Sequence, residues 1–126
     1  MFTIDNIISD GRRQLTWNQR YELKASLNHG KNILQTEAQL AAYLSWYGEM
    51  HKVKCRVATQ NFPFDSLTNR IHIIDWGCGQ GIASLCFLES LEQRGLLSSV
   101  RKVTLIEPSI AAIGRARQNI EKATSG

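Results

Sequence analysis

Apolar and aromatic side chains recur at three- and four-residue spacing in the first half of the chain, as expected for one face of a helix. The clearest series consists of Leu40, Tyr43, Leu44, Tyr47, Met50 and His51. Thr36 and Gln39 stand before it in the T-x-x-Q pattern of a capping box, which satisfies backbone N–H groups of a first turn. We therefore predict a helix that begins at Thr36. Weaker helical patterns cover residues 3–8 and 17–27, and His29-Gly30 marks a break.

The pattern changes near Asn61, where Pro63 favours an extended connecting segment. Residues 71–74 are a short β-branched run, typical of a buried strand in a parallel sheet. Helical spacing then returns at Ile82, Leu85, Leu88 and Leu91. Gly95 follows as a residue suited to the left-handed position beyond a helix end.

A second strand is predicted over residues 103–106, and Ser109 is placed to cap a last helix. The order strand, helix, strand, helix implies parallel strands joined by right-handed crossovers. We predict an α/β fold that contains the first β-α-β-α portion of a doubly wound sheet, preceded by a helical N-terminal region. The helical region spans residues 1–62 and the sheet region spans residues 63–126.

A glycine-rich segment, Asp75-Trp76-Gly77-Cys78-Gly79-Gln80-Gly81, lies between the first predicted strand and its helix. Glycine permits positive φ and lets a ligand approach the backbone, while the following helix N-terminus offers unpaired N–H groups. Asp75 and Glu107 end the two strands at the same sheet edge, where open α/β folds bind ligands. These carboxylates can accept hydrogen bonds from an ammonium group or from ribose hydroxyls.

The glycine spacing separates two ligand classes. A dinucleotide fingerprint G-x-G-x-x-G starting at Gly77 would need a small residue where Ile82 stands. The D-x-G-x-G-x-G form instead resembles motif I of class I S-adenosylmethionine-dependent methyltransferases, over residues 71 to about 121. A nicotinamide- or other nucleotide-binding oxidoreductase and a non-catalytic interaction module remain the alternatives.

The resemblance implies a Rossmann-like methyltransferase sheet and a set of S-adenosyl-L-methionine contacts. The motif I loop would wrap the methionine part, with Asp75 near the ammonium, and Glu107 would hold the ribose hydroxyls. Pro108 and Ser109 would lie near the adenine. The candidate cofactor site is therefore Asp75, Trp76, Gly77, Cys78, Gly79, Gly81, Glu107, Pro108 and Ser109. Asp75 could instead cap its own turn, and Trp76 could be buried against the sheet.

Methyltransferases of this class have more strands than the two predicted here, and their acceptor-positioning residues follow later strands. We therefore expect a cofactor-binding part of a larger enzyme, inactive alone, with its catalytic residues beyond residue 126. The helical region would form a lid or an acceptor-binding part. Two strands leave backbone edges unpaired, so self-association is also expected.

Charge adds one candidate partner. The net charge is +4, and Lys52, Lys54 and Arg56 are concentrated on the main predicted helix. They could face phosphates, which makes RNA the favoured acceptor, although a solvated helix face gives the same pattern. We expect the Tyr and Trp residues of this half to form core rather than a ring-stacking platform.

The remaining features point to an ordinary intracellular protein. No long apolar run or signal-like N-terminus occurs, and the three cysteines form no CxxC pair. We therefore expect a cytoplasmic location and no cysteine zinc site. The histidines are too scattered to suggest metal ligands, and Cys78 is expected to be a small filler rather than a nucleophile.

Overall fold

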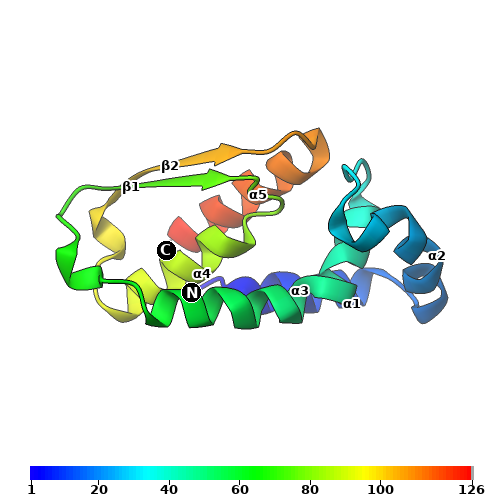
Figure 1. The fold of residues 1–126 in the computed structure, drawn as a ribbon, viewed down its shortest axis with the longest axis horizontal. Coiled ribbons are helices and arrows are strands. Elements are labelled where there is room, and N and C mark those ends of the chain that lie inside the picture. The colour runs from blue at the N-terminus through cyan, green and yellow to red at the C-terminus, as the bar shows by residue number, and fades with distance from the viewer. Residues whose placement is uncertain (126) are drawn as a thin grey trace.

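Five α-helices and a two-stranded sheet form over residues 1–125, which the computed structural model describes (Figure 1). The helices are α1 (Ile4–Gln14), α2 (Trp17–Leu27), α3 (Glu37–Gln60), α4 (Ile82–Gln93) and α5 (Ile110–Thr124). The strands are β1 (Ile71–Trp76) and β2 (Val100–Ile106). Short 3₁₀ turns occupy Asn28–Gly30, Phe64–Ser66 and Leu97–Ser99.

The helix ends follow from side chains close by in sequence. The predicted capping box is confirmed, because the Gln39 backbone N–H donates to Thr36 Oγ1 at 3.1 Å and the Thr36 N–H donates to Gln39 Oε1 at 3.2 Å. Ser109 caps α5 as predicted, accepting from the Ala112 N–H at 3.0 Å. Gly95 has φ +70° just after α4. The predicted break is also present, since His29 has φ +54°.

The two strands pair in parallel, as predicted, and both are longer than the predicted runs. The register places Ile73 opposite Val103 and Asp75 opposite Leu105. Helix α4 makes the crossover between them, so the glycine segment and the end of β2 meet at one edge. The architecture is a mixed helix-and-strand fold with helices on one side of a parallel pair.

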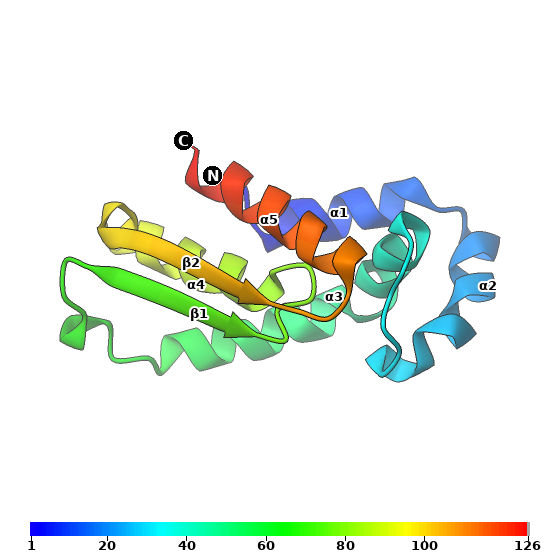
Figure 2. The ribbon, with the colours of Figure 1, turned by 90° about the horizontal axis from the view of Figure 1, so that it is seen from above.

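One face of the sheet is bare within residues 1–125. Figures 1 and 2 show α4 and α5 beneath the strands, α1 and α3 lower still, and no helix on the upper side. Ile74 is 51% exposed and Trp76 is 76% exposed on that upper side. Among the described residues neither outer strand edge has a strand partner, so the expected self-association stays a prediction.

A single hydrophobic core crosses the predicted boundary at residue 62. Ile4 and Ile8 of α1 and Leu44 of α3 belong to the same buried cluster as Leu85 and Leu88 of α4. The helical region is therefore packed beneath the sheet region and forms part of its core. Within the described residues, no helix is both long and apolar enough to cross a bilayer.

The expectation that the aromatic residues of the first half are core is wrong for Trp17 and Tyr21, which are 58% and 53% exposed. Helix α2 buries only Leu27 and packs mainly against α3. Because it lies at the edge of the helical region, the helix leaves most of its surface in solvent. Met50, which the helical pattern grouped with the buried face of α3, is also exposed because it lies at the margin of that face.

Close approach of α1 and α3 depends on glycine. A Cβ atom at Gly48 would lie 2.8 Å from Ile8 Cγ1, closer than packed carbons allow. The substitution Gly48→Ala should therefore lower the free energy of unfolding by about 1–3 kcal/mol, measured by urea denaturation.

Gly114→Ala is the matched control. Gly114 is also helical, but a Cβ there meets no atom within 4 Å, so alanine should stabilise the protein by about 0.5–1 kcal/mol. Equal effects of the two substitutions would contradict the packing seen between α1 and α3.

Candidate functional site

A cavity of about 450 Å³ opens where β1 and β2 end. Its walls come from the glycine segment, the end of β2, the start of α5, α3 and the connection before α3. The lining residues are Lys31, Asn32, Ile33, Leu34, Tyr43, His51, Cys55, Asp75, Gly77, Cys78, Gly79, Gln80, Ile82, Ala83, Glu107, Pro108, Ser109 and Ala112. Seven of the nine sequence-predicted site residues are among them; Trp76 and Gly81 are not.

Gly77 and Gly79 leave open space in the loop. Their φ angles are +64° and +53°, and a Cβ atom at either would meet nothing within 4 Å. Side chains are therefore excluded here by backbone conformation rather than by crowding, and the bare backbone faces the cavity. A ligand can approach the peptide groups closely at these two positions.

Gly81, also predicted as a site residue, does not line the cavity. It is buried with φ +85°, and a Cβ there would lie 3.5 Å from the Ala116 Cβ of α5. Gly81 is the N-cap residue just before α4 and has no side chain, so it offers no acceptor to the first-turn N–H groups of that helix. This glycine supports the turn and the packing of α4 against α5 instead of touching the cavity.

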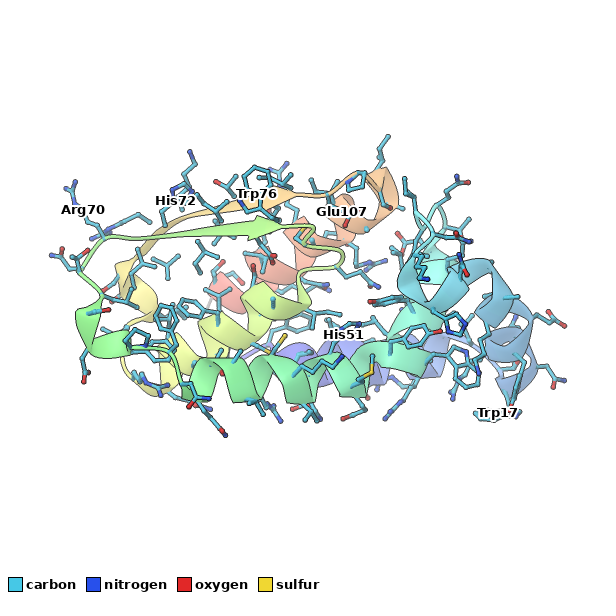
Figure 3. All side chains as sticks on the ribbon, viewed as in Figure 1. Trp17, His51, Arg70, His72, Trp76 and Glu107 are labelled. Carbon is cyan, nitrogen blue, oxygen red and sulfur yellow. The ribbon has the colours of Figure 1, made fainter. Side chains whose placement is uncertain are left out.

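Glu107 is held at the end of β2 by the backbone. Its Oε1 accepts from the Gly79 N–H at 3.0 Å, and its Oε2 accepts from the Ser109 N–H at 2.8 Å. The carboxylate therefore links the glycine loop to the start of α5 and lies on the cavity wall (Figure 3). Each carboxylate oxygen has further lone-pair capacity for a ligand.

Asp75 also points into the cavity. Its Oδ2 accepts a hydrogen bond from Ser84 Oγ of α4 at 2.6 Å. The alternative in which Asp75 caps its own turn is not what the structure shows, because the hydrogen bond goes to the following helix. Asp75 and Glu107 together make this side of the cavity acidic.

Trp76 lies outside the cavity. Side chains alternate along a strand, so the residue after Asp75 points to the opposite face, and Figure 3 shows Trp76 on the bare upper side. Trp76 therefore neither lines the cavity nor is buried against the sheet.

Cys78 is buried in the loop, and burial, with the nearby carboxylates, raises the pKa of its thiol to about 11. A thiol of this kind is a poor nucleophile, as expected for a filler.

Tyr43 and His51 of α3 form the opposite wall, and the sequence pattern placed them on a core face rather than in a site. The Tyr43 hydroxyl lies 2.6 Å from His51 Nε2, and the rings stack with centroids 5.6 Å apart. Burial lowers the pKa of His51, and Lys54 lowers it further. Burial also raises the pKa of Tyr43, so a neutral phenol and a neutral imidazole share this hydrogen bond.

Three buried polar side chains join the walls. Gln80 Nε2 donates to the Leu40 carbonyl of α3 at 3.0 Å, and Asn119 Nδ2 donates to the Gln80 carbonyl at 2.9 Å. The Ser109 hydroxyl donates to the Leu34 carbonyl in the connection before α3. The loop, α3, α5 and that connection are thus tied together around the cavity.

Cys55 of α3 and Cys86 of α4 form a thiol pair beside the cavity. Hydrogen bonding to Cys86 lowers the pKa of Cys55 to about 7, against the opposing effects of burial and Asp75. The same hydrogen bond, together with burial, raises the pKa of Cys86. The sequence offered no sign of this pair, because the two cysteines are far apart along the chain.

The basic helix predicted to face phosphates is largely neutralised. Lys52 Nζ lies 2.9 Å from Asp5 Oδ1 and 2.7 Å from Glu49 Oε2. Arg56 pairs with Asp5 at 3.0 Å, so two of the three proposed phosphate contacts hold α3 against α1. Lys54 remains exposed. Within residues 1–125 no group of three or more potential metal ligands comes together.

Comparison with protein-family models, curated proteins and solved structures finds no match to this chain.

Acidification should destabilise the fold through His51. Its pKa is lower in the folded protein than in the unfolded chain, so the unfolded state takes up the proton first. This contribution to stability is present above the unfolded pKa, about 6.5, and is lost as the pH falls from there through the lower folded pKa. The urea midpoint should therefore fall between about pH 7 and about pH 5, and less in His51→Gln, which keeps an acceptor for Tyr43. The same fall in both proteins would assign it to other groups.

Cys55 should be the first cysteine to react. At about pH 7 a thiol of pKa about 7 is half ionised, so iodoacetamide should label Cys55 at least about a hundredfold faster than Cys78. Peptide mapping after brief labelling measures the order. Cys86→Ala removes the hydrogen-bond partner and should slow labelling of Cys55; unchanged labelling would mean that the pair does not control this thiol.

Proposed function

We propose that the cavity binds S-adenosylmethionine and that the chain is the cofactor-binding part of a methyltransferase. One observation carries the proposal: a carboxylate at the end of β2, Glu107, is fixed by backbone amides across from an open glycine loop at the end of β1. This arrangement offers a partner for sugar hydroxyls beside a bare backbone surface. The cavity volume of about 450 Å³ is within the range of small-molecule sites.

The loop side suits an amino acid. Gly77 and Gly79 present backbone without side chains, and the first turn of α4 has N–H groups without intrahelical partners. A carboxylate is favoured near these donors and the positive end of the helix dipole. Asp75, fixed by Ser84, supplies an acceptor for an ammonium group. Both charged ends of a methionine therefore find complementary groups.

The β2 side suits a nucleoside. Glu107 can accept from two ribose hydroxyls while it keeps its bonds to the Gly79 and Ser109 amides. Pro108 is exposed at the cavity, and Ile33 and Leu34 contribute apolar surface from the connection before α3. These groups can bracket an adenine ring.

Electrostatics favour a positively charged ligand. When bound, S-adenosylmethionine supplies a methyl group on a cationic sulfur leaving group, so the protein has mainly to position the acceptor. Asp75 and Glu107 outnumber Lys31, the one cationic residue among the lining residues, and the facing Tyr43–His51 pair is uncharged at neutral pH. That pair also offers hydroxyl and imidazole groups to an acceptor molecule at the same wall.

A nicotinamide cofactor fits less well. Its fingerprint requires a small residue at the position of Ile82, and here the Ile82 side chain is nearly buried at the start of α4 and lines the cavity. A pyrophosphate approaching the helix would meet this branched side chain together with two carboxylates.

Titration calorimetry with S-adenosylmethionine and with NAD tests the proposal on the chain itself. We expect weak binding of S-adenosylmethionine, since later strands and loops of the larger enzyme would complete the adenine pocket, and no heat of binding for NAD at the same concentrations. Glu107→Ala should weaken binding at least about tenfold, since hydrogen bonds to a charged group contribute about 1.5–3 kcal/mol. Glu121→Ala, which removes an exposed carboxylate from α5, is the matched control and should bind normally.

Two results would overturn the assignment. Preference for NAD would show that the glycine spacing was misinterpreted. Equal binding by the Glu107→Ala and wild-type proteins would place the ligand elsewhere.

A further inference from the structure

Three aromatic rings lie together at the end of the molecule opposite to the starts of the two strands. Trp17 and Tyr21 of α2 and Trp46 of α3 form what we call the aromatic patch. Ring centroids lie 5.1 Å apart for Trp17–Tyr21, 5.2 Å for Tyr21–Trp46 and 5.9 Å for Trp17–Trp46. The Trp46 indole N–H donates to the Arg20 carbonyl at 2.9 Å, which fixes that ring on α2.

The patch is ordered without being buried. More than half of the surface of both Trp17 and Tyr21 is exposed, and Figure 3 shows Trp17 projecting from the end of the molecule. The rings contact one another edge-on or tilted rather than stacked face to face, so the exposed surface of Trp17 and Tyr21 stays available to a flat ligand. Large aromatic surfaces of this kind on a soluble domain mark interaction sites.

Two cations belong to the same patch. Lys24 Nζ lies 4.2 Å from the Trp46 ring centroid, and Arg20 Cζ lies 5.7 Å from that of Trp17. Among residues 1–125 neither cation has a carboxylate within 4.0 Å, unlike Lys52 and Arg56. The buried Arg20 Nε also lacks a hydrogen-bond partner in the described residues. Arg20 Nη2 donates to the Arg12 carbonyl at 2.6 Å, and this neutral partner leaves the positive charge in place. The patch therefore carries two cations that have no carboxylate partner among the described residues.

We propose that the aromatic patch binds single-stranded nucleic acid. Exposed aromatic rings stack on bases, and adjacent cations without carboxylate partners attract the phosphates between them. Only a single strand presents base faces, because a duplex stacks them inside. The proposal concerns α2 and does not depend on the cofactor proposed for the cavity.

The patch is also linked to the cavity along the chain. Helix α2 leads through the turn at Asn28–Gly30 into residues 31–34, which line the cavity. Exposed Lys31 lies in this connection and extends the positive charge from α2 toward the cavity. A strand held on α2 would pass beside that opening.

Fluorescence titration tests the proposal. The background protein carries Trp76→Phe, so that emission comes from Trp17 and Trp46 of the patch. Oligouridine and oligothymidine of about 12 nucleotides are titrated at low salt, with a duplex of the same length and heparin as comparison polyanions. We expect quenching by a single strand, with tighter binding than to duplex or heparin.

Variants assign the binding to the patch. Trp17→Ala and Tyr21→Ala should each weaken binding about tenfold. Binding by Trp17→Ala is followed through the remaining emission of Trp46. Tyr21→Phe keeps the ring and should bind normally. Lys24→Gln should make the slope of log affinity against log salt shallower by about 0.7. Circular dichroism checks that each variant is folded.

The RNA and DNA arms identify which strand is preferred, and binding of either supports the proposal. It is overturned if neither strand quenches emission, if duplex or heparin binds equally well, or if folded Trp17→Ala binds like its parent. Failure of cofactor binding in the separate calorimetric experiment would leave these results unaffected.

Discussion

The side-chain amide of Gln80 is the constraint on which the cavity depends. Gln80 lies inside the glycine loop and is almost fully buried. Its side-chain amide donates to the Leu40 carbonyl of α3, and its backbone carbonyl accepts a hydrogen bond from the Asn119 side chain of α5. A buried amide without partners costs several kcal/mol, so the loop cannot shift unless both helices move with it. The fold therefore holds a flexible glycine backbone in one shape by anchoring the residue between two glycines.

Local features of the fold were predictable because they depend on neighbouring residues. The start of α3 at Thr36, the cap of α5 at Ser109 and the turn after α4 at Gly95 each require side chains or φ angles within a few positions. The parallel pairing followed from the alternation of strands and helices. The packing of the helical region into the core of the sheet region could not be predicted, since it depends on how α1 and α3 meet α4 in space.

The lining of the cavity was predictable where it comes from the motif and the strand ends. Asp75, Gly79 and Glu107 line the cavity because parallel strands end at the same edge. Trp76 was misplaced by treating the motif as a continuous loop, although strand alternation turns it to the other face. Gly81 does not line the cavity, because it lies between the loop and α5, where a Cβ atom would contact Ala116.

Residues from the helical region were harder to assign. Tyr43 and His51 lie on the helix face that the periodicity identified, but a periodic face does not distinguish core from a cavity wall. Lys52 and Arg56 resembled a basic surface because their partner Asp5 lies 47 and 51 residues away in sequence. Whether a charge is free or paired is decided by tertiary packing.

The two amide hydrogen bonds to Glu107 have an energetic consequence for any ligand that reaches this carboxylate. Fixing a free glutamate side chain costs about 1.5–2 kcal/mol of rotamer entropy. Here folding has already ordered the side chain, since both oxygens are engaged by the Gly79 and Ser109 backbone. The acceptor is preorganised, so an incoming hydroxyl meets it in its bound geometry and loses little affinity to side-chain reorganisation.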